Sequence, residues 1–167
     1  MVEKEKVFSS KIKYSGLFTF SDFYRFCYEW LDQQTDLDVA EDQYAEKIKG
    51  DVKEIEFKWS GSRKVTDYFK FSVKVDFRII GMKEVEVTKQ GIKTKMNQGN
   101  VEVKMSGTLE RDYQGKFEDN AFQKFLRAIY EKWVIPSRIS EYEDKLVGDC
   151  DEFLAQVKSY LDLEGKK

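Results

Sequence analysis

Histidine, the side chain most used for acid–base catalysis and metal binding near neutral pH, is absent from the 167 residues of this chain. Because histidine is the side chain that changes charge near neutral pH, its absence excludes Ser-His-Asp and Cys-His catalysis and HExxH zinc sites. The sequence also lacks the GxxxxGKS/T, GxGxxG and GxSxG patterns. Catalysis by Lys, Tyr or carboxylates stays open. We therefore expect a protein that is not an enzyme and that holds no cofactor or metal.

Carboxylates are densest near the C-terminus, on a segment whose apolar residues recur at helical spacing. One interpretation is an acidic surface for a basic protein partner, or a loose site for a divalent ion. The other is the solvated face of a helix, where acids near the N-terminus are favoured by the helix dipole. The candidate partner surface consists of Glu141, Glu143, Asp144, Asp149, Asp151 and Glu152.

Lysines are frequent in the second half of the predicted sheet, at positions 83, 89, 93, 95 and 104. A lysine-rich sheet face could contact phosphates. However, no Phe, Tyr or Trp occurs between Ile79 and Leu109 to stack on bases, and Glu84, Glu86 and Glu102 dilute the charge. We therefore do not expect nucleic acid as a partner, and the formal net charge of -2 agrees with this expectation.

Aromatic residues make up 15% of the chain and fall mainly on the apolar faces of predicted elements. The simplest interpretation is that they form the core. Alternatively, they line a cavity between sheet and helices that holds an apolar small molecule. The candidate cavity residues are Trp59, Phe69, Phe71, Val73, Phe77, Phe122, Phe125 and Trp133.

Strands must position many of these side chains, and the clearest strand covers residues 65–80, VTDYFKFSVKVDFRII. Its odd positions are apolar except Asp67, and its even positions are mostly polar, which predicts one buried and one solvated face. Similar alternation predicts strands over 7–20, 55–59, 84–88, 92–96 and 101–109. Residues 39–48 fit either a strand or an amphipathic helix. Gly81 ends or bends the long strand, and residues 97–100 form a turn.

Helical spacing of apolar residues covers the remaining segments. Residues 21–34 form one predicted helix, a second begins at Asp119 or Asn120, and Pro136 breaks the chain before a third. Ser140 and Glu143 have the spacing of a capping box at the start of that last helix. Its near-heptad apolar seam, which could pair with another copy or another protein, contains Ile139, Tyr142, Leu146, Cys150, Phe153, Val157 and Tyr160 or Leu161.

Together these elements predict an α+β fold, with an antiparallel sheet of about six or seven strands packed against one N-terminal helix and two C-terminal helices. We expect a single domain over 1–167, with a strand and helix at 7–34, an antiparallel meander at 42–112 and a helical part at 119–162. Cys27 and Cys150 are expected to be buried and reduced. The sequence has neither a membrane-spanning apolar run nor a secretory signal pattern, so the expected location is the cytoplasm.

This order of elements, from Phe8 to Leu161, resembles the START-like, or helix-grip, fold, in which a curved sheet wraps a long C-terminal helix. The resemblance lies in element order and not in a residue motif. It implies an apolar cavity between sheet and helix, with a ligand or a partner protein as the molecule bound.

Two functional hypotheses follow. The first is a non-enzymatic protein-interaction or assembly module that uses the C-terminal helix, either for self-association or for binding a protein partner. The alternative is a START-like binder or carrier of an apolar small molecule, held in a cavity between the sheet and the C-terminal helices.

Overall fold

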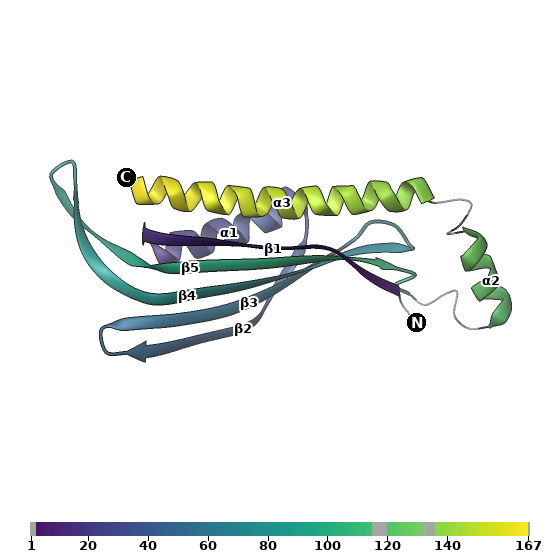
Figure 1. Ribbon diagram of the computed structural model, residues 1–167, viewed down its shortest axis with the longest axis horizontal. Coiled ribbons are helices and arrows are strands. Elements are labelled where there is room, and N and C mark those ends of the chain that lie inside the picture. The colour runs from purple at the N-terminus through teal and green to yellow at the C-terminus, as the bar shows by residue number, and fades with distance from the viewer. Residues whose placement is uncertain (1–2, 115–119, 131, 133–135, 167) are drawn as a thin grey trace.

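The computed structural model describes residues 3–114, 120–130, 132 and 136–166. These residues form one antiparallel sheet, two helices that lie along one face of it, and a further helix beyond one end (Figure 1). In chain order, the elements are β1 (Glu3–Phe18), α1 (Phe20–Thr35), β2 (Asp38–Lys49), β3 (Val52–Lys64), β4 (Phe69–Lys89), β5 (Ile92–Arg111), α2 (Ala121–Ile129) and α3 (Pro136–Lys166).

The strand order across the sheet is β1-β5-β4-β3-β2, and all neighbours are antiparallel. Strands β2 to β5 form the predicted meander, in which short turns join sequential neighbours. Helix α1 carries the chain across one face, so that β1 pairs with β5 at the opposite edge from β2. The described part of the sheet therefore has two edge strands, β1 and β2.

The prediction of six or seven strands is wrong, because the described residues form five. Residues 84–88 continue β4, and residues 92–96 continue β5. Gly81, at φ 65°, allows β4 to bend without ending, and the pairing register shifts between Ile80 and Lys83. Opposite this bulge, a Cβ on Gly99 would lie 3.1 Å from the Met82 Cα, so a larger residue there would require the β4 backbone to shift. The long strand therefore bends at Gly81, one of the two outcomes that the sequence allows, and the predicted turn at residues 97–100 is wrong, because these residues continue β5.

Residues 39–48, which fit either a strand or a helix by sequence, form most of β2. This strand pairs with β3 from Asp38 opposite Ser62 to Lys49 opposite Val52, with an irregularity between Glu41 and Gln43.

The predicted start of the central strand is also corrected. The Thr66 hydroxyl accepts hydrogen bonds from the backbone N–H groups of Tyr68 and Phe69, at 3.1 and 3.0 Å. Residues 65–68 are therefore a turn, and β4 begins at Phe69.

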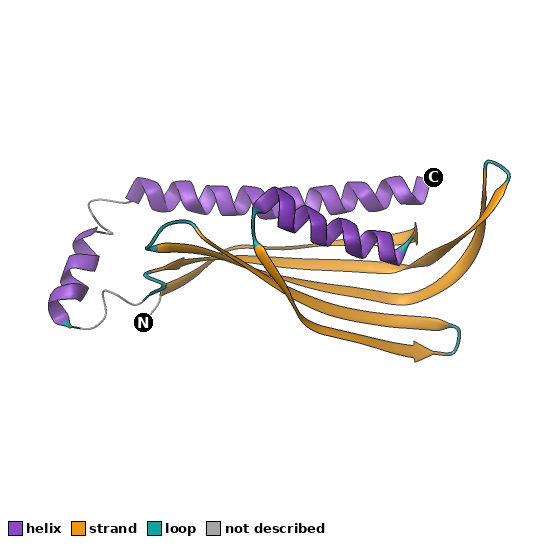
Figure 2. Cartoon of the chain, turned by 180° about the vertical axis from the view of Figure 1, so that it is seen from behind, coloured by secondary structure: helices purple, strands orange, loops and turns teal. Residues whose placement is uncertain are grey.

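Helices α1 and α3 lie side by side on one face of the sheet, α3 against β1 and β5 (Figure 2). The two helices contact each other through the stacked rings of Phe26 and Tyr160, 4.3 Å apart. The seam of α3 is buried in the same core, as are Cys27 and Cys150, which are free thiols as predicted. Gly107 on β5 allows α3 to pack close to the sheet, since a Cβ there would lie 3.0 Å from the Cys150 Sγ.

Helix α3 begins at Pro136, a residue that has no backbone N–H to leave unpaired in the first turn. Ile135, where the sequence predicts the break, lies outside the described residues. The predicted capping box is wrong, because Ser140 lies a full turn inside the helix.

Asn120 does cap α2, where its side chain accepts a hydrogen bond from the Gln123 N–H at 2.9 Å. Helix α2 lies beyond the end of the sheet and buries none of its residues, so it does not cover the sheet as predicted (Figure 1).

None of the described helices combines the length and the apolar character that crossing a bilayer requires.

Candidate functional site: an aromatic groove between α1 and β2

The predicted cavity residues separate into two groups. Trp59, Phe69, Phe71, Val73 and Phe77 come together on the helix-facing side of β3 and β4, where all are buried. Phe122 and Phe125 are instead 67% and 60% exposed on α2. They share no surface with the first group, because α2 lies beyond the sheet. Trp133 lies outside the described residues.

Where the described residues enclose a void between the sheet and α3, the protein's own side chains nearly fill it. The void between them, beside Phe71, Met105 and Leu146, has a volume of about 10 Å³. That is about the space that one water molecule needs, roughly 10–15 Å³. The described interior at this place therefore offers no room for a drug-sized apolar ligand, which typically occupies roughly 300–1,000 Å³.

The predicted acidic residues of α3 differ in their surroundings. Four of them, Glu141, Asp144, Asp151 and Glu152, are exposed on the outer side of the helix. Asp149 is partly covered and pairs with Lys145 at 3.3 Å. Glu143 is partly covered, and burial and the nearby Glu5 carboxylate of β1 raise its pKa. Within the described ranges, no group of three or more Asp, Glu or Cys side chains is arranged to hold a metal ion.

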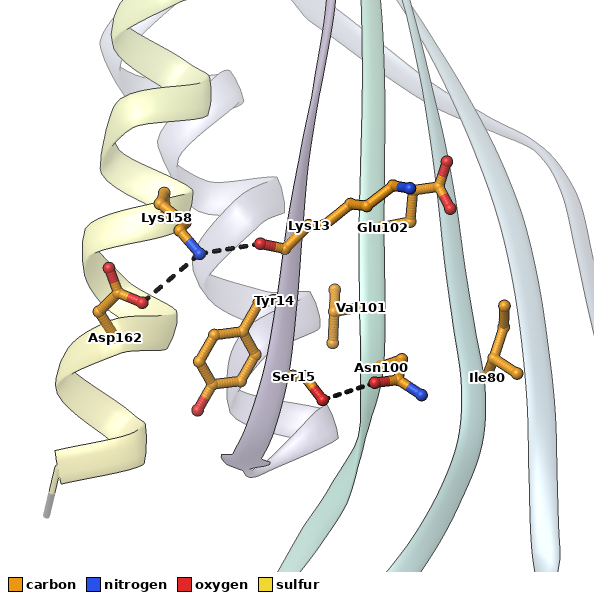
Figure 3. A pocket seen from close by; sticks show the side chains of 9 residues that line it. All are labelled: Lys13, Tyr14, Ser15, Ile80, Asn100, Val101, Glu102, Lys158 and Asp162. Atoms are coloured by element: carbon orange, nitrogen blue, oxygen red, sulfur yellow. Dashed lines mark hydrogen bonds and ion pairs between the residues drawn. The ribbon is translucent and has the colours of Figure 1, made fainter.

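A polar depression of about 570 Å³ lies where the C-terminal part of α3 meets β1 (Figure 3). Its polar groups largely satisfy one another. The Lys158 Nζ donates to the Lys13 carbonyl at 2.8 Å and lies 3.7 Å from Asp162, and Ser15 donates to the Asn100 side chain at 2.6 Å. Burial, with Asp162 and Glu164 nearby, raises the pKa of Tyr14. These contacts fasten α3 along the β1 edge.

A larger and more apolar depression, of about 620 Å³, lies between α1 and β2. Phe20, Tyr24 and Tyr28 of α1 form its wall, and Tyr44 of β2 lies opposite. The three α1 residues recur at every fourth position, so they share one side of the helix. The stripe that α1 buries against the core is a different one, Phe23, Cys27 and Leu31. Helix α1 thus has a core-facing stripe and a second, aromatic stripe that is only partly covered.

Two buried rings of β3, Phe57 and Trp59, support the tyrosines of this α1–β2 groove from beneath. The Tyr24 ring lies 5.2 Å from each of them, measured between ring centroids, and meets Trp59 edge to face. Tyr28 also meets Trp59 edge to face at 5.7 Å, and Tyr44 stacks on Phe57 at 5.9 Å. Such offset and edge-to-face pairs hold rings in place. The groove is therefore preformed by the packing beneath it.

Two carboxylates of β2, those of Glu41 and Glu46, lie beside the tyrosines of the groove. Glu41 lies opposite Trp59 in the strand register, Tyr44 opposite Phe57, and Glu46 opposite Ile55, so these β2 residues share the helix-facing side of the sheet. The Tyr44 hydroxyl donates to Glu46 at 2.7 Å. Burial first, and then the Glu46 and Glu41 carboxylates, raise the pKa of Tyr44. Burial and Glu41 likewise raise the pKa of Tyr24, against an opposing effect of the Trp59 indole. The groove is aromatic with a negative rim.

Sequence reasoning missed this groove. The i, i+4 spacing of Phe20, Tyr24 and Tyr28 is readable in the sequence, yet it lies next to the stronger core stripe of the same helix. Tyr44 lies in the segment that fitted both strand and helix. That these two segments lie side by side depends on the position of β2 at the edge of the sheet.

No protein-family model matches the chain, and comparisons with curated proteins and with solved structures gave no significant match. The class that fold and site define is an α+β domain with two helices on one face of an antiparallel sheet and an aromatic groove beside one sheet edge. The START-like resemblance stays a prediction.

Proposed function

We propose that this protein is a non-enzymatic interaction module that binds another protein on the helical side of its sheet. One observation carries the proposal: an aromatic groove of about 620 Å³ is open at the surface between α1 and an edge strand, whereas the described void between the sheet and α3 is only about 10 Å³. Aromatic surface in a preformed concave site is typical of binding surfaces, since rings contribute much contact area at little entropic cost.

The charge of the helical layer supports a basic partner. The sequence of α3 contains eight acidic and four basic residues, and that of α1 contains three acidic and one basic. The exposed acids Glu141, Asp144, Asp151 and Glu152 belong to this layer, so the C-terminal helix takes part through its outer face. Its apolar seam does not take part, because Leu146, Phe153 and Val157 are buried in the core. Electrostatic complementarity of this kind mainly speeds association and selects partners.

The alternative proposal, a carrier of an apolar small molecule between the sheet and the C-terminal helices, receives less support. The void of about 10 Å³ beside α3 gives such a ligand no space unless the core opens. Native mass spectrometry separates the two proposals. A mass above 19.8 kDa that is lost on denaturation would favour the carrier, and a bare chain would favour the interaction module.

The direct test uses a photo-crosslinking amino acid at one of three exposed positions: Tyr28 in the groove, Asp144 on α3, or Lys74 on the bare face of the sheet. Each variant is irradiated in an extract of the cells that make the protein. We expect a protein adduct from Tyr28 and a weaker one from Asp144. Adducts from Lys74 alone, or from none of the three, would overturn the proposal.

A further inference from the structure

The outer edge of β2 is open. In the part of the chain that the structure describes, β2 has β3 on one side and no strand on the other. Alternate residues of an edge strand direct their N–H and C=O groups outward, where a further strand can pair with them. After the irregularity at Glu41–Gln43, the register runs without a shift from Gln43 to Lys49. This regular segment, which begins beside Tyr44, is long enough to template a strand of about seven residues.

The α1–β2 groove lies on the helical side of this edge. Tyr44, Glu46 and Ile48 alternate along β2 and point to that side, and Ile48 is 71% exposed. A strand added beside β2 would direct every second side chain toward the same side, next to these three residues. Strand addition gives affinity through the backbone, and pockets for alternate side chains give specificity. Edge and groove therefore form one continuous surface.

The chemistry of the groove favours a cation. Several aromatic rings, those of Phe20, Tyr24, Tyr28 and Tyr44, line a space bordered by carboxylates, an arrangement that attracts Lys or Arg through the ring faces. The chain already contains such contacts, with the Arg63 guanidinium 5.2 Å from the centre of the Phe71 ring and the Lys158 Nζ 5.6 Å from that of Tyr14.

Arg25 also lines the groove, but Glu29 follows it one helical turn later on the same side of α1 and balances its charge. The Glu41 and Glu46 carboxylates of β2 therefore determine the sign of the field at the rim. Over residues 20–49, which include α1 and β2, there are eight acidic and three basic residues, whereas the whole chain is nearly balanced at 31 and 29. The acidity of this segment is complementary to a basic occupant.

We propose that the free edge of β2 and the α1–β2 groove together bind an extended, basic segment of a partner protein, which adds as a strand beside β2 and places a Lys or Arg side chain among the groove's aromatic rings. This inference rests on the proposed function and specifies how its partner is held. A second copy of this chain fits less well, because β2 contains four acidic and only two basic residues, so that the edge strands of two copies are both net negative.

Defined peptides test the binding mode. The first probe is a fluorescent nine-residue peptide of alternating Lys and Val. The second has Glu in place of Lys, and the third is the Lys peptide with N-methyl groups at alternate backbone nitrogens, which blocks strand pairing. We expect fluorescence anisotropy to detect binding of the first probe only. Acetyl-lysine methylamide, a free cation without a strand, should compete with it weakly.

Matched protein variants locate the site. The double variant Glu41→Gln/Glu46→Gln should weaken binding of the Lys peptide by about tenfold, which is about 1.4 kcal/mol. The control Glu84→Gln/Glu86→Gln removes the same charge from the exposed tip of β4 and should change binding by less than about twofold. Thermal denaturation of each variant checks that the fold is intact.

Several outcomes would overturn the inference: equal weakening by both double variants, binding of the N-methylated peptide as tightly as the unmodified one, or competition by acetyl-lysine methylamide at matching concentration. A dimer in analytical ultracentrifugation that Glu41→Gln/Glu46→Gln strengthens would assign the edge to a second copy instead. If these peptide tests fail while the crosslinker at Tyr28 captures a protein, the binding mode is wrong and the proposed function stands. If both fail, both are wrong.

Discussion

Helices α3 and α1 cover the sheet beside its two edge strands, β1 and β2, to different extents. Along β1, helix α3 covers the sheet over most of its length, and its Lys158 donates to the Lys13 carbonyl of the edge strand itself (Figure 3). Along β2, helix α1 is only 16 residues long, about 24 Å, and β2 continues beyond it at about 3.3 Å per residue (Figure 2). Both β1 and β2 are edge strands of the described sheet, but α3 covers the face beside β1, whereas the face beside β2 keeps exposed aromatic rings. We therefore expect substitutions on the β1 side to affect stability more than substitutions on the β2 side, where the proposed binding site lies.

The largest expected effect comes from removing a ring on the β1 side. Phe153→Ala deletes a side chain with no exposed surface that contacts Trp30 at 5.5 Å, and should lower the free energy of unfolding by about 3–5 kcal/mol. Tyr28→Ala, at the groove, should cost less than about 1 kcal/mol, because this ring is 40% exposed. Urea denaturation of both variants measures the difference. Similar losses from the two would contradict the contrast between the edges.

The next effect tests how closely α3 approaches the sheet. Gly107→Ala places a Cβ 3.0 Å from the Cys150 Sγ and 3.4 Å from the Leu146 Cγ, and should destabilise the protein by about 1–3 kcal/mol. Gly148→Ala is the matched control, since its Cβ would meet nothing within 4 Å. Alanine there should stabilise helix α3 by about 0.5–1 kcal/mol. A loss of stability in the Gly148 variant would mean that α3 packs differently.

A pH dependence should follow from the buried thiols. Burial raises the pKa of Cys27 well above its ordinary value of 9.0 and that of Cys150 to about 12. In the unfolded chain both thiols ionise near pH 9, while in the folded chain they stay protonated. Their contribution is therefore complete below pH 9 and is lost as the pH rises, by up to about 1.4 kcal/mol per pH unit for each thiol.

Denaturant titrations between pH 8 and 10, under reducing conditions, measure this slope before the tyrosines add to it. The variant Cys27→Ala/Cys150→Ala should show a flatter profile over the same range, whatever its absolute stability. An unchanged slope in that variant would show that other groups cause the pH dependence. Above pH 10, the raised pKa values of Tyr14, Tyr24 and Tyr44 should steepen the loss for the same reason.

The smallest effect concerns the rim of the groove. Glu46→Gln removes the carboxylate that accepts the Tyr44 hydroxyl, and should move the pKa of Tyr44 back toward 10 while changing stability by less than about 0.5 kcal/mol. An ultraviolet or NMR titration of the tyrosines reads this shift. Glu56→Gln, on the bare face of β3, should leave the titration unchanged. If the pKa of Tyr44 does not change in this variant, Glu46 does not contribute negative charge at the rim of the groove.

Much of the core could be read from the sequence, because burial imposes a period. Strand β4 alternates as predicted from Phe69 to Ile79, and the seam residues Leu146, Cys150, Phe153 and Val157 are all buried. The strand count could not be read in the same way. A glycine followed by a change of pattern looks the same in a sequence whether the strand ends or bends, and only the pairing of Ile80 with Asn100 and Lys83 with Gln98 distinguishes the two.

The sequence by itself determined which face of each element is apolar, because side-chain hydrophobicity and local period do not depend on distant contacts. It also determined the acidity of residues 20–49 and the absence of histidine. The tertiary structure alone decided which apolar face would be covered. The α3 seam packs against β5 at Gly107 and is buried. Helix α2 has an equally clear apolar stripe, but it lies beyond the sheet, so that this stripe stays exposed. The groove arises in the same way, since the rings of α1 and β2 become one surface only when both elements lie on the same sheet edge.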